Sequence, residues 1–458
     1  MLVGDAAPRP STRCYAANMV MRTRTVLGVA FAAMGACGDD PGRTGQSGSA
    51  SLSVGDGIGS LSATDSATGN GDGDGDGDGG IKLDAQSQTD LGVEGCAGDS
   101  QGGGGGGMGE DGELEFSYIW IADSGEGTMS KINTRTLVEE GRYVVRPDQA
   151  GNPSRTSVNL SGDVAIANRA GGLTKVAATK ERCVDADGDG MITTSSSAAY
   201  LPWGQDECVL WHYAYQTESQ RPVAWAPGTW NQQTCAYDNE DVWTATGSTA
   251  MGIDVWLHDG DTGMQIGTAH IGEMTFDGYG IYGGAVDGEG NFWGTMLGGI
   301  LLTRVDKETF EHQVWPVPIS SYGMTVDSDG YVWACSFDVA RFDPETETWQ
   351  TAMGVGGSGG CMGDGNGKIW LASSPLVAVD TATLAVVDTI MIPSYAHGVS
   401  VDFDGYVWGV TLQEPYAYKA DPTTHTVETF TGLTLPYTYS DMTGFALKNA
   451  GTIPTPAG

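Results

Sequence analysis

The sequence has 458 residues, 71 of them glycine, and a formal net charge of −36 at pH 7. Residues 38–112 consist mainly of Gly, Ser, Thr and Asp, with alternating Gly and Asp at 71–78. Such a segment buries too little apolar surface to offset the entropy of an ordered chain, so we expect a disordered acidic tether. The charge argues against nucleic acid or anionic lipid headgroups as partners of the folded part, and it suits cations or basic partners.

An export signal precedes the tether. Residues 21–24 carry two arginines, residues 26–33 are apolar, and Met34-Gly35-Ala36-Cys37 follows. This pattern resembles a bacterial lipobox, which implies a signal peptide over 1–37 and lipid attachment at Cys37. We therefore expect an exported lipoprotein held to a membrane by its lipid anchor. Gly38 favours the outer membrane, facing the periplasm or the cell surface, over the inner membrane.

A repeat predicts the fold. Three segments, at 284–293, 323–333 and 398–408, share a β-branched run, a turn built on Asp and Gly, and an aromatic strand, and a weaker copy ends at 365–370. Their tryptophans are spaced by 40, 37 and 38 residues, the period of a four-stranded propeller blade. We interpret the repeated Trp, Gly and Asp residues as structural.

A second pattern places Asp or Asn three residues before Thr. An Asp or Asn that opens a turn can accept hydrogen bonds from nearby backbone N–H groups, so we assign this pattern to the hairpin between the third and fourth strands of a blade. It occurs at Asn133/Thr136, Asp259/Thr262, Asp306/Thr309, Asp343/Thr346, Asp380/Thr383 and Asp421/Thr424.

Counting aromatic strands gives an all-β, seven-bladed β-propeller over 113–450, followed by a tail at 451–458. Weaker copies lie at 118–121, 163–167 and 241–243, and the degenerate second copy leaves six or eight blades open. Residues 440–446 resemble a first strand without its aromatic partner, whereas the first blade begins at its aromatic strand. We expect the C-terminal strand to complete the first blade and close the ring, which removes exposed sheet edges.

A long insertion is expected between blades two and three, over 181–236. Removal of Cys14 and acylation of Cys37 would leave six cysteines, and export permits disulfides among them. Cys183–Cys208 is the first pairing we predict and Cys335–Cys361 the second.

Within the insertion lies an acidic loop that begins Asp185-Ala186-Asp187-Gly188-Asp189-Gly190-Met191. Carboxylates at alternate positions, a glycine and then a backbone carbonyl match the start of a calcium loop, which predicts Ca²⁺ held by Asp185, Asp187, Asp189 and Met191. The twelfth position is Ser196 instead of the Glu of an EF-hand, so a shorter extracellular calcium loop or a plain acidic turn are the alternatives.

The blade motif resembles that of streptogramin lyases, also called virginiamycin B lyases, and the chain as a whole resembles bacterial lipoproteins with such propellers and no assigned role. The resemblance implies a seven-bladed propeller and an enzyme that opens a cyclic lactone by elimination with a His base, a Glu and Mg²⁺. The family's Pro-His-Gly appears once, as Ala396-His397-Gly398, and the same place holds Tyr282 and Tyr322 in neighbouring blades. At the family's Glu position only the first blade offers a carboxylate, Asp123.

Two functions follow. The first is a propeller that binds an unidentified small ligand or protein partner at the cell envelope, with Tyr282, Tyr322 and His397 on the binding face. The alternative is a carbon–oxygen lyase in which His397 and Asp123 meet near the axis as the catalytic pair, with Mg²⁺ required only in that case. The poor match of the catalytic positions favours the binding protein.

Overall fold

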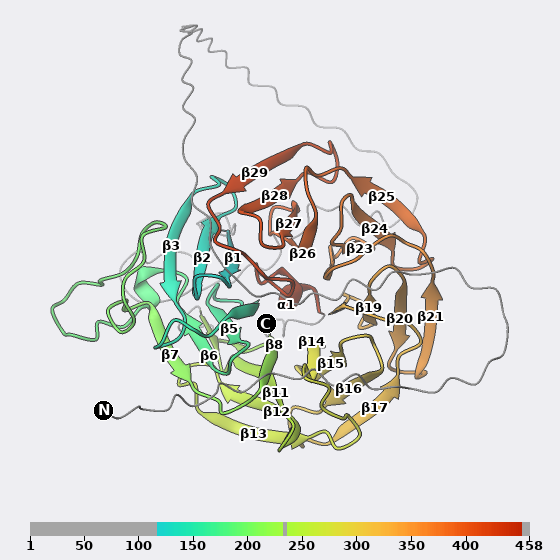
Figure 1. Ribbon diagram of the computed structural model, residues 1–458, viewed down its shortest axis with the longest axis horizontal. Helices are drawn as coiled ribbons and strands as arrows, with labels where there is room; N and C mark the ends of the chain where they lie inside the picture. The colour runs from blue at the N-terminus through green and yellow to red at the C-terminus, as the bar shows by residue number, and fades with distance from the viewer. Residues whose placement is uncertain (1–116, 232–235, 451–458) are drawn as a thin grey trace, which may run out of the picture. The chain divides into compact units, whose positions relative to one another are not determined.

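The computed structural model describes residues 117–231 and 236–450, which form seven antiparallel sheets arranged in a ring (Figure 1). The predicted seven-bladed propeller is confirmed. The signal peptide, Cys37, the tether and the tail at 451–458 lie outside the described residues. No helix among the described residues has the length and apolar character needed to cross a bilayer.

The blades follow one another in chain order. Blade one contains β1 (Tyr118–Asp123), β2 (Thr128–Asn133) and β3 (Glu139–Val144). Blade two contains β4 (Pro153–Val158), β5 (Val164–Asn168), β6 (Leu173–Val176) and β7 (Val209–Tyr213). Blade three contains β8 (Ser219–Trp225), β11 (Asp241–Ser248), β12 (Gly252–Asp259) and β13 (Gln265–His270). Blade four contains β14 (Ile281–Val286), β15 (Phe292–Met296), β16 (Leu301–Val305) and β17 (His312–Pro316).

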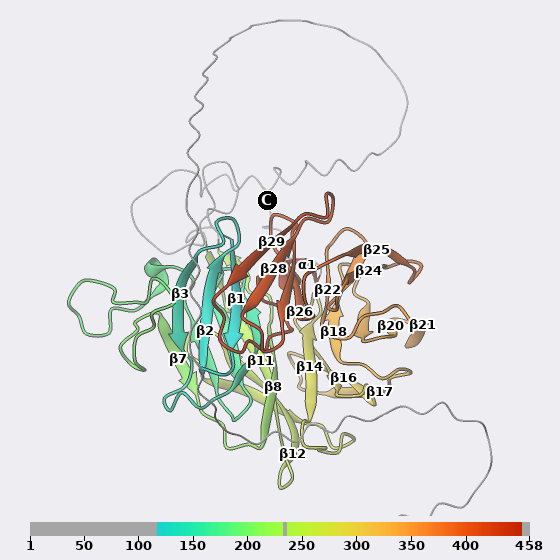
Figure 2. The same cartoon turned by 45° about the horizontal axis from the view of Figure 1, so that its top comes forward.

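The last three blades repeat the same meander. Blade five contains β18 (Gly323–Val326), β19 (Val332–Cys335), β20 (Val339–Asp343) and β21 (Thr348–Ala352). Blade six contains β22 (Cys361–Gly363), β23 (Lys368–Leu371), β24 (Leu376–Asp380) and β25 (Val386–Ile390). Blade seven contains β26 (Ala396–Val401), β27 (Val407–Thr411), β28 (Tyr416–Ala420) and β29 (Val427–Thr431). In blades two to seven the first strand is innermost, and Figure 2 shows β8, β14 and β26 among these inner strands.

The C-terminal segment completes blade one, with a shift from the predicted register. The N–H of Tyr437 donates to the carbonyl of Ala122 at 3.1 Å, and the N–H of Trp120 donates to the carbonyl of Met442 at 2.8 Å. Residues 437–442 therefore run beside β1, although they are not assigned as a strand. Gly444, with φ of 88°, starts the short helix α1 (Phe445–Asn449), so the end of the predicted strand at 440–446 is helical.

The predicted insertion at 181–236 is smaller than expected, because two propeller strands lie inside it. β7 closes blade two and β8 opens blade three. The excursions that remain are residues 177–208, which include a 3₁₀ turn (Lys180–Arg182), and the connection from β8 to β11, which carries the hairpin β9 (Thr229–Asn231) and β10 (Ala236–Asp238). β7 and β8 lack the Asp-Gly turn of the repeat, so no pattern in the sequence predicts them.

The repeated Asp and Trp residues form one hydrogen-bonded unit. In blade seven, Asp402 accepts hydrogen bonds from the backbone N–H groups of Asp404 and Tyr406 through one oxygen and from the indole N–H of Trp408, at 2.8 Å, through the other. The same pattern links Asp287 to Trp293, Asp327 to Trp333 and Asp364 to Trp370. The carboxylate thus shapes the turn and accepts a hydrogen bond from a buried indole N–H that would otherwise have no partner.

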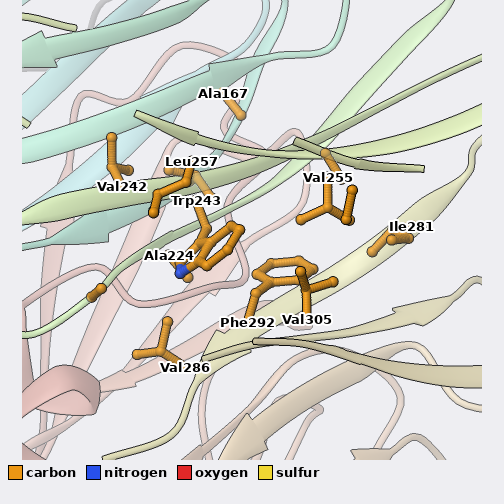
Figure 3. Close-up of a cluster of buried hydrophobic side chains, with 14 of the residues drawn as sticks. Ala167, Ala224, Val242, Trp243, Val255, Leu257, Ile281, Val286, Phe292 and Val305 are labelled. Atoms are coloured by element: carbon orange, nitrogen blue, oxygen red, sulfur yellow. The ribbon is translucent and has the colours of Figure 1, made fainter. Parts of the chain in front are cut away.

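The aromatic strands supply the core between blades. The blade tryptophans Trp120, Trp243, Trp293, Trp333, Trp370 and Trp408 are fully buried. Figure 3 shows one such layer, in which Trp243 of β11 and Phe292 of β15 lie between Val242, Val286 and Val305. Their ring centroids are 5.9 Å apart. Burial of large rings between adjacent sheets is the dominant stabilising contribution expected for such a repeat.

The second pattern also acts as predicted. In the turn from β24 to β25, Asp380 accepts hydrogen bonds from both the backbone N–H and the hydroxyl of Thr383, at 2.8 and 2.7 Å. Leu384, the next residue, has φ of 59° and closes the turn in the left-handed conformation. The corresponding turns at Asn133, Asp259, Asp306, Asp343 and Asp421 show the same capping of the Thr N–H.

Candidate functional site

The inner strands bring six different side chains together at one end of the ring. Arg155 belongs to β4, Arg221 to β8, Tyr282 to β14 and His397 to β26. Tyr322 directly precedes β18, and Tyr437 comes from the segment beside β1. These six residues are called the central cluster below. They occupy positions where the blades differ, in contrast to the repeated Asp and Trp.

Blade six contributes glycines instead of a side chain. The N–H of Gly360 donates to the carbonyl of His397 at 2.9 Å. A Cβ atom on Gly359 would lie 2.2 Å from that same carbonyl oxygen, and one on Gly360 would lie 2.6 Å from the carbonyl oxygen of Tyr439. Any larger residue here would therefore push the neighbouring backbones away from the cluster.

Three tyrosine hydroxyls form a closed triangle at the centre of the cluster. The hydroxyl of Tyr437 lies 2.7 Å from that of Tyr282 and 2.6 Å from that of Tyr322, and the latter two are 3.1 Å apart. Burial would raise the pKa of Tyr437, but the nearby Arg155 and the hydrogen bonds from the other two hydroxyls lower it overall. The triangle therefore presents polar hydroxyls next to positive charge.

His397 extends this network as a neutral ring. Its Nε2 lies 2.5 Å from the Tyr322 hydroxyl and its Nδ1 lies 3.0 Å from the Tyr395 hydroxyl. The Tyr395 hydroxyl donates to the carbonyl of Ser358, so it accepts from Nδ1–H, and Nε2 is left to accept from Tyr322. Burial, together with the charge of Arg155, lowers the pKa of His397 to about 3. The ring is therefore uncharged at neutral pH.

The arginines lie against the tyrosine rings. The guanidinium carbon of Arg155 lies 4.9 Å from the ring centroid of Tyr282 and also packs on Tyr437 and Tyr439. A third arginine, Arg169, follows β5 and lies 4.5 Å from the Tyr437 ring, and Arg221 lies 4.8 Å from the Tyr282 ring. Cations over aromatic faces at these distances are attracted to the ring quadrupole.

The cluster grades from an exposed rim to a buried floor. Tyr279 and Tyr395 are exposed, Arg169, Arg221, Tyr322 and Tyr437 are half-buried, and Arg155, Tyr282 and His397 are buried. Toward the other end of the inner strands lies a cavity of about 30 Å³, about enough for a single water molecule, whose lining includes Ser157, Met324 and Leu447. At that end α1 contacts β18, β22 and β26. The space between the inner strands is thus filled below the cluster.

Of the predicted site residues, the structure brings Tyr282, Tyr322 and His397 together and places Asp123 elsewhere. Asp123, at the end of β1, is fully buried and accepts hydrogen bonds from the Ser130 hydroxyl and the Thr434 N–H, both at 2.6 Å. Burial raises its pKa to about 7, against the opposing effect of Arg142. Among the described residues, no hydrogen bond or ion pair joins Asp123 to His397.

The cluster does not fit the magnesium ion that the lyase resemblance implies. Mg²⁺ prefers carboxylate and water oxygens in octahedral geometry. Within the described chain, the polar groups gathered here are guanidinium, phenol and imidazole, and Asp123 is engaged with Ser130, Thr434 and Arg142. We therefore derive no catalytic step through a metal ion at this position.

The acidic loop of the excursion is exposed. Carboxylate oxygens of Asp185, Asp187 and Asp189 lie within 4.8 Å of one another. Asp185 accepts hydrogen bonds from the backbone N–H groups of Gly188 and Gly190, so the loop curls around this carboxylate. The side chain of Met191 points to solvent, and only its carbonyl was predicted as a ligand. Calcium binding stays a prediction.

The two predicted disulfides are confirmed. Cys183–Cys208 fastens the excursion to the start of β7, with Cα atoms 4.4 Å apart. Cys335–Cys361 joins β19 of blade five to β22 of blade six, with Cα atoms 6.2 Å apart. Cys37, Cys96 and Cys235 lie outside the described residues.

Comparison with known proteins identifies relatives by fold alone. No protein-family model matches the chain, and no curated protein matches its sequence. A streptogramin B lyase structure is similar at a TM-score of 0.47 and 13% identity, over 64% of this chain and 87% of that one. The selenomethionine-substituted virginiamycin B lyase from Staphylococcus aureus gives 0.43 and 13% over 62% and 87%. A catalytically inactive variant of that enzyme with quinupristin gives 0.42 and 15% over 61% and 84%.

Proposed function

We propose that this propeller is a ligand-binding protein of the cell envelope and that its ligand occupies the central cluster. The observation that carries the proposal is the convergence of Arg155, Arg221, Tyr282, Tyr322, His397 and Tyr437 at one end of the ring. Side chains from different blades meet there with a buried floor and an exposed rim. Convergent polar groups in an aromatic setting are typical of small-molecule sites.

The tyrosine triangle supports binding over a purely structural role. Its hydroxyls bond mainly to one another and to His397, so a ligand can replace these bonds without breaking secondary structure. In contrast, Tyr439 donates to the backbone carbonyl of Tyr282 at 2.8 Å and holds the C-terminal segment in place. We assign Tyr439 to the scaffold and the other three tyrosines to the site.

The test is a thermal-unfolding screen of the full chain against sugars, organic acids and short peptides. A ligand at a hundredfold excess over its Kd stabilises the folded state by about 2.7 kcal/mol, which raises the midpoint visibly. Tyr322→Phe should weaken any hit, because it removes one hydroxyl and keeps the ring. Tyr416→Phe on β28, outside the cluster, is the matched control. A hit whose affinity is unchanged by Tyr322→Phe and by Tyr282→Phe would contradict the proposed site.

For localisation, we propose an exported lipoprotein acylated at Cys37 and carried to the outer membrane. The support is the charged segment, the short apolar run and the Met-Gly-Ala-Cys sequence that ends at Cys37. Metabolic labelling with palmitate in a bacterial host tests the anchor, and density-gradient separation of membranes tests its location. Cys37→Ser should abolish the label and release the protein from membranes. Membrane retention of Cys37→Ser without label would contradict a lipid anchor.

The elimination reaction is the weaker candidate. General-base work needs a group whose pKa lies near the working pH, and the pKa of His397 is lowered to about 3. The ring also contacts two phenol hydroxyls, whereas Asp123 is engaged within blade one. Incubation with quinupristin and magnesium followed by chromatography should leave the depsipeptide intact. Ring opening that is lost in His397→Ala would replace the binding proposal with an enzyme.

A further inference from the structure

Two arginines of the central cluster and the neighbouring Arg169 have no acidic partner among the described residues. Arg155, Arg169 and Arg221 form no ion pair with any described carboxylate. Five of the other six described arginines do form such pairs: Arg135, Arg142, Arg146, Arg182 and Arg304. In a chain with 58 acidic and 22 basic residues, this is the reverse of what random surface pairing would give.

Arg155 is the extreme case. Its side chain is 1% exposed, and its Nε and Nη2 atoms have no hydrogen-bond partner among the described residues. One bond remains, from Nη1 to the carbonyl of Ser154 at 3.1 Å. Burial of a charge without a counter-charge costs several kcal/mol, and buried donors without acceptors add to that cost. A ligand that supplies acceptors to these nitrogens would offset this cost.

The three charges also repel one another. Burial is the main cause that lowers the pKa of Arg155 to about 10, and the neighbouring Arg221 lowers it further. The pKa of Arg169 is lowered by the same two causes. The interactions that oppose these shifts come from phenol groups, not carboxylates. An anion placed among the three guanidinium groups would relieve both their repulsion and the unmet hydrogen bonding of Arg155.

The arginines keep free donors for that anion. Arg169 donates to the backbone and side-chain oxygens of Asn152, and the Nε of Arg221 donates to the Ser219 hydroxyl at 3.2 Å. These bonds orient the side chains by their Nε edges. A guanidinium held in this way can present the rest of its planar fork to a carboxylate.

We propose that the central cluster binds a small hydroxylated carboxylic acid, with the carboxylate received by Arg155 between Arg169 and Arg221 and the ligand hydroxyls received by Tyr282, Tyr322 and Tyr437. The inference rests on the proposed function and narrows its ligand to one chemical class. The net acidic charge of the protein predicts cationic partners, and the cluster is a local exception to it.

Isothermal titration calorimetry of the full chain with glucuronate and glucose tests the assignment, since the two sugars differ by a carboxylate. Glucuronate should bind at least about tenfold more tightly than glucose, because glucose leaves the buried charge of Arg155 without a partner. Arg155→Gln should reduce glucuronate affinity at least about tenfold. Arg341→Gln is the control, because Arg341 of β20 also has no ion pair with a described residue but contacts Tyr331 and the carbonyl of Thr381, outside the cluster.

Arg221→Gln is the second variant in case Arg155→Gln does not fold, and its glucuronate affinity should fall as well. Equal affinity for glucose and glucuronate, both lost in Tyr322→Phe, would overturn the carboxylate and leave the binding site standing. Unchanged glucuronate affinity in Arg155→Gln and Arg221→Gln would overturn the arginine assignment. Tighter binding of inorganic phosphate than of glucuronate would replace the carboxylate by a phosphate group. Failure of glucuronate and of every screened ligand to bind would overturn both proposals.

Discussion

The Asp–Trp turns of the blades and the central cluster handle buried polar groups in opposite ways. In each turn one carboxylate satisfies the backbone of its own loop and a buried indole N–H, as Asp402 does for Trp408. In the cluster, Arg155 is buried as deeply, and two of its nitrogens have no partner in the part of the chain that the structure describes. The satisfied residues recur from blade to blade, and the unsatisfied ones differ between blades. We infer that the regular positions stabilise the ring, and the divergent positions are where we propose the binding site.

The largest effect is expected from substitution of a repeated Asp. Asp402→Ala removes the acceptor for the Trp408 indole and for two backbone N–H groups, so we expect a loss of roughly 2–4 kcal/mol in the free energy of unfolding. Asp404→Ala is the matched control, since Asp404 makes a partly exposed ion pair with Arg135 and should cost under about 1 kcal/mol. Urea unfolding measures both. Similar midpoints for the two variants would show that the repeated Asp is not structural.

In the central cluster, we expect a substitution to raise the free energy of unfolding instead of lowering it. Arg155→Met removes an unpaired buried charge and keeps a long side chain, so the ligand-free protein should gain about 1–3 kcal/mol after the lost ring contacts are subtracted. The same variant should no longer bind glucuronate. Arg341→Met should change stability by less than about 1 kcal/mol. A destabilised Arg155→Met would mean that Arg155 stabilises the fold, as the Asp–Trp turns do.

A third effect depends on pH. The pKa of His397 falls from 6.5 to about 3 on folding, so the unfolded chain takes up a proton that the folded protein does not. The contribution of His397 to stability is therefore present above pH 6.5 and is lost as pH falls toward 3, by about 1–2 kcal/mol between pH 7 and pH 5.

His397→Asn should remove this part of the slope, and Tyr416→Phe on β28, outside the cluster, should leave it. Asp123 and Glu240, whose pKa values burial raises to about 7, act in the opposite direction in all three proteins, so the difference between variants isolates His397. Urea unfolding at several pH values gives the slopes. Parallel profiles for wild type and His397→Asn would contradict a neutral, buried ring.

The smallest effect concerns the acidic loop, away from the cluster. If Asp185, Asp187 and Asp189 hold calcium, a fivefold excess of Ca²⁺ over its Kd should stabilise the protein by about 1 kcal/mol. Replacing the three by Asn should abolish the shift, and Mg²⁺ should not reproduce it. Identical melting in Ca²⁺ and EDTA would identify the loop as an acidic turn.

The sequence predicts the parts of the fold that local chemistry determines. The Asp-Gly turns, the aromatic strands and the Asp–Thr hairpins each have a physical reason at fixed spacing, and Cys183–Cys208 is predicted because both cysteines flank one insertion. The limits of β7, β8 and the C-terminal segment were missed. Their strands are defined by pairing with distant partners, such as Trp120 with Met442, and not by local turns.

The same limit applies to the site. Tyr282, Tyr322 and His397 each stand eleven residues before a blade Trp, which made them visible. Arg155 stands eleven residues before Ile166 of the degenerate second blade, so the same count could have found it. Arg221 is separated from its aromatic strand by the β9–β10 hairpin, and Tyr437 comes from the far end of the chain. The spacing to a blade Trp therefore predicts neither Arg221 nor Tyr437, and only the folded ring brings them to the centre.

Hydrogen–deuterium exchange of the full chain with and without glucuronate tests the central claim most directly, because it locates the ligand without a mutation. We predict slower exchange at the starts of the inner strands and in the segment beside β1, with little change in the outer hairpins. The protected residues should be around 153–156, 219–222, 281–283, 395–398 and 435–439. Protection confined to the excursion at 177–208, or no protection at any segment, would contradict a ligand site at the central cluster.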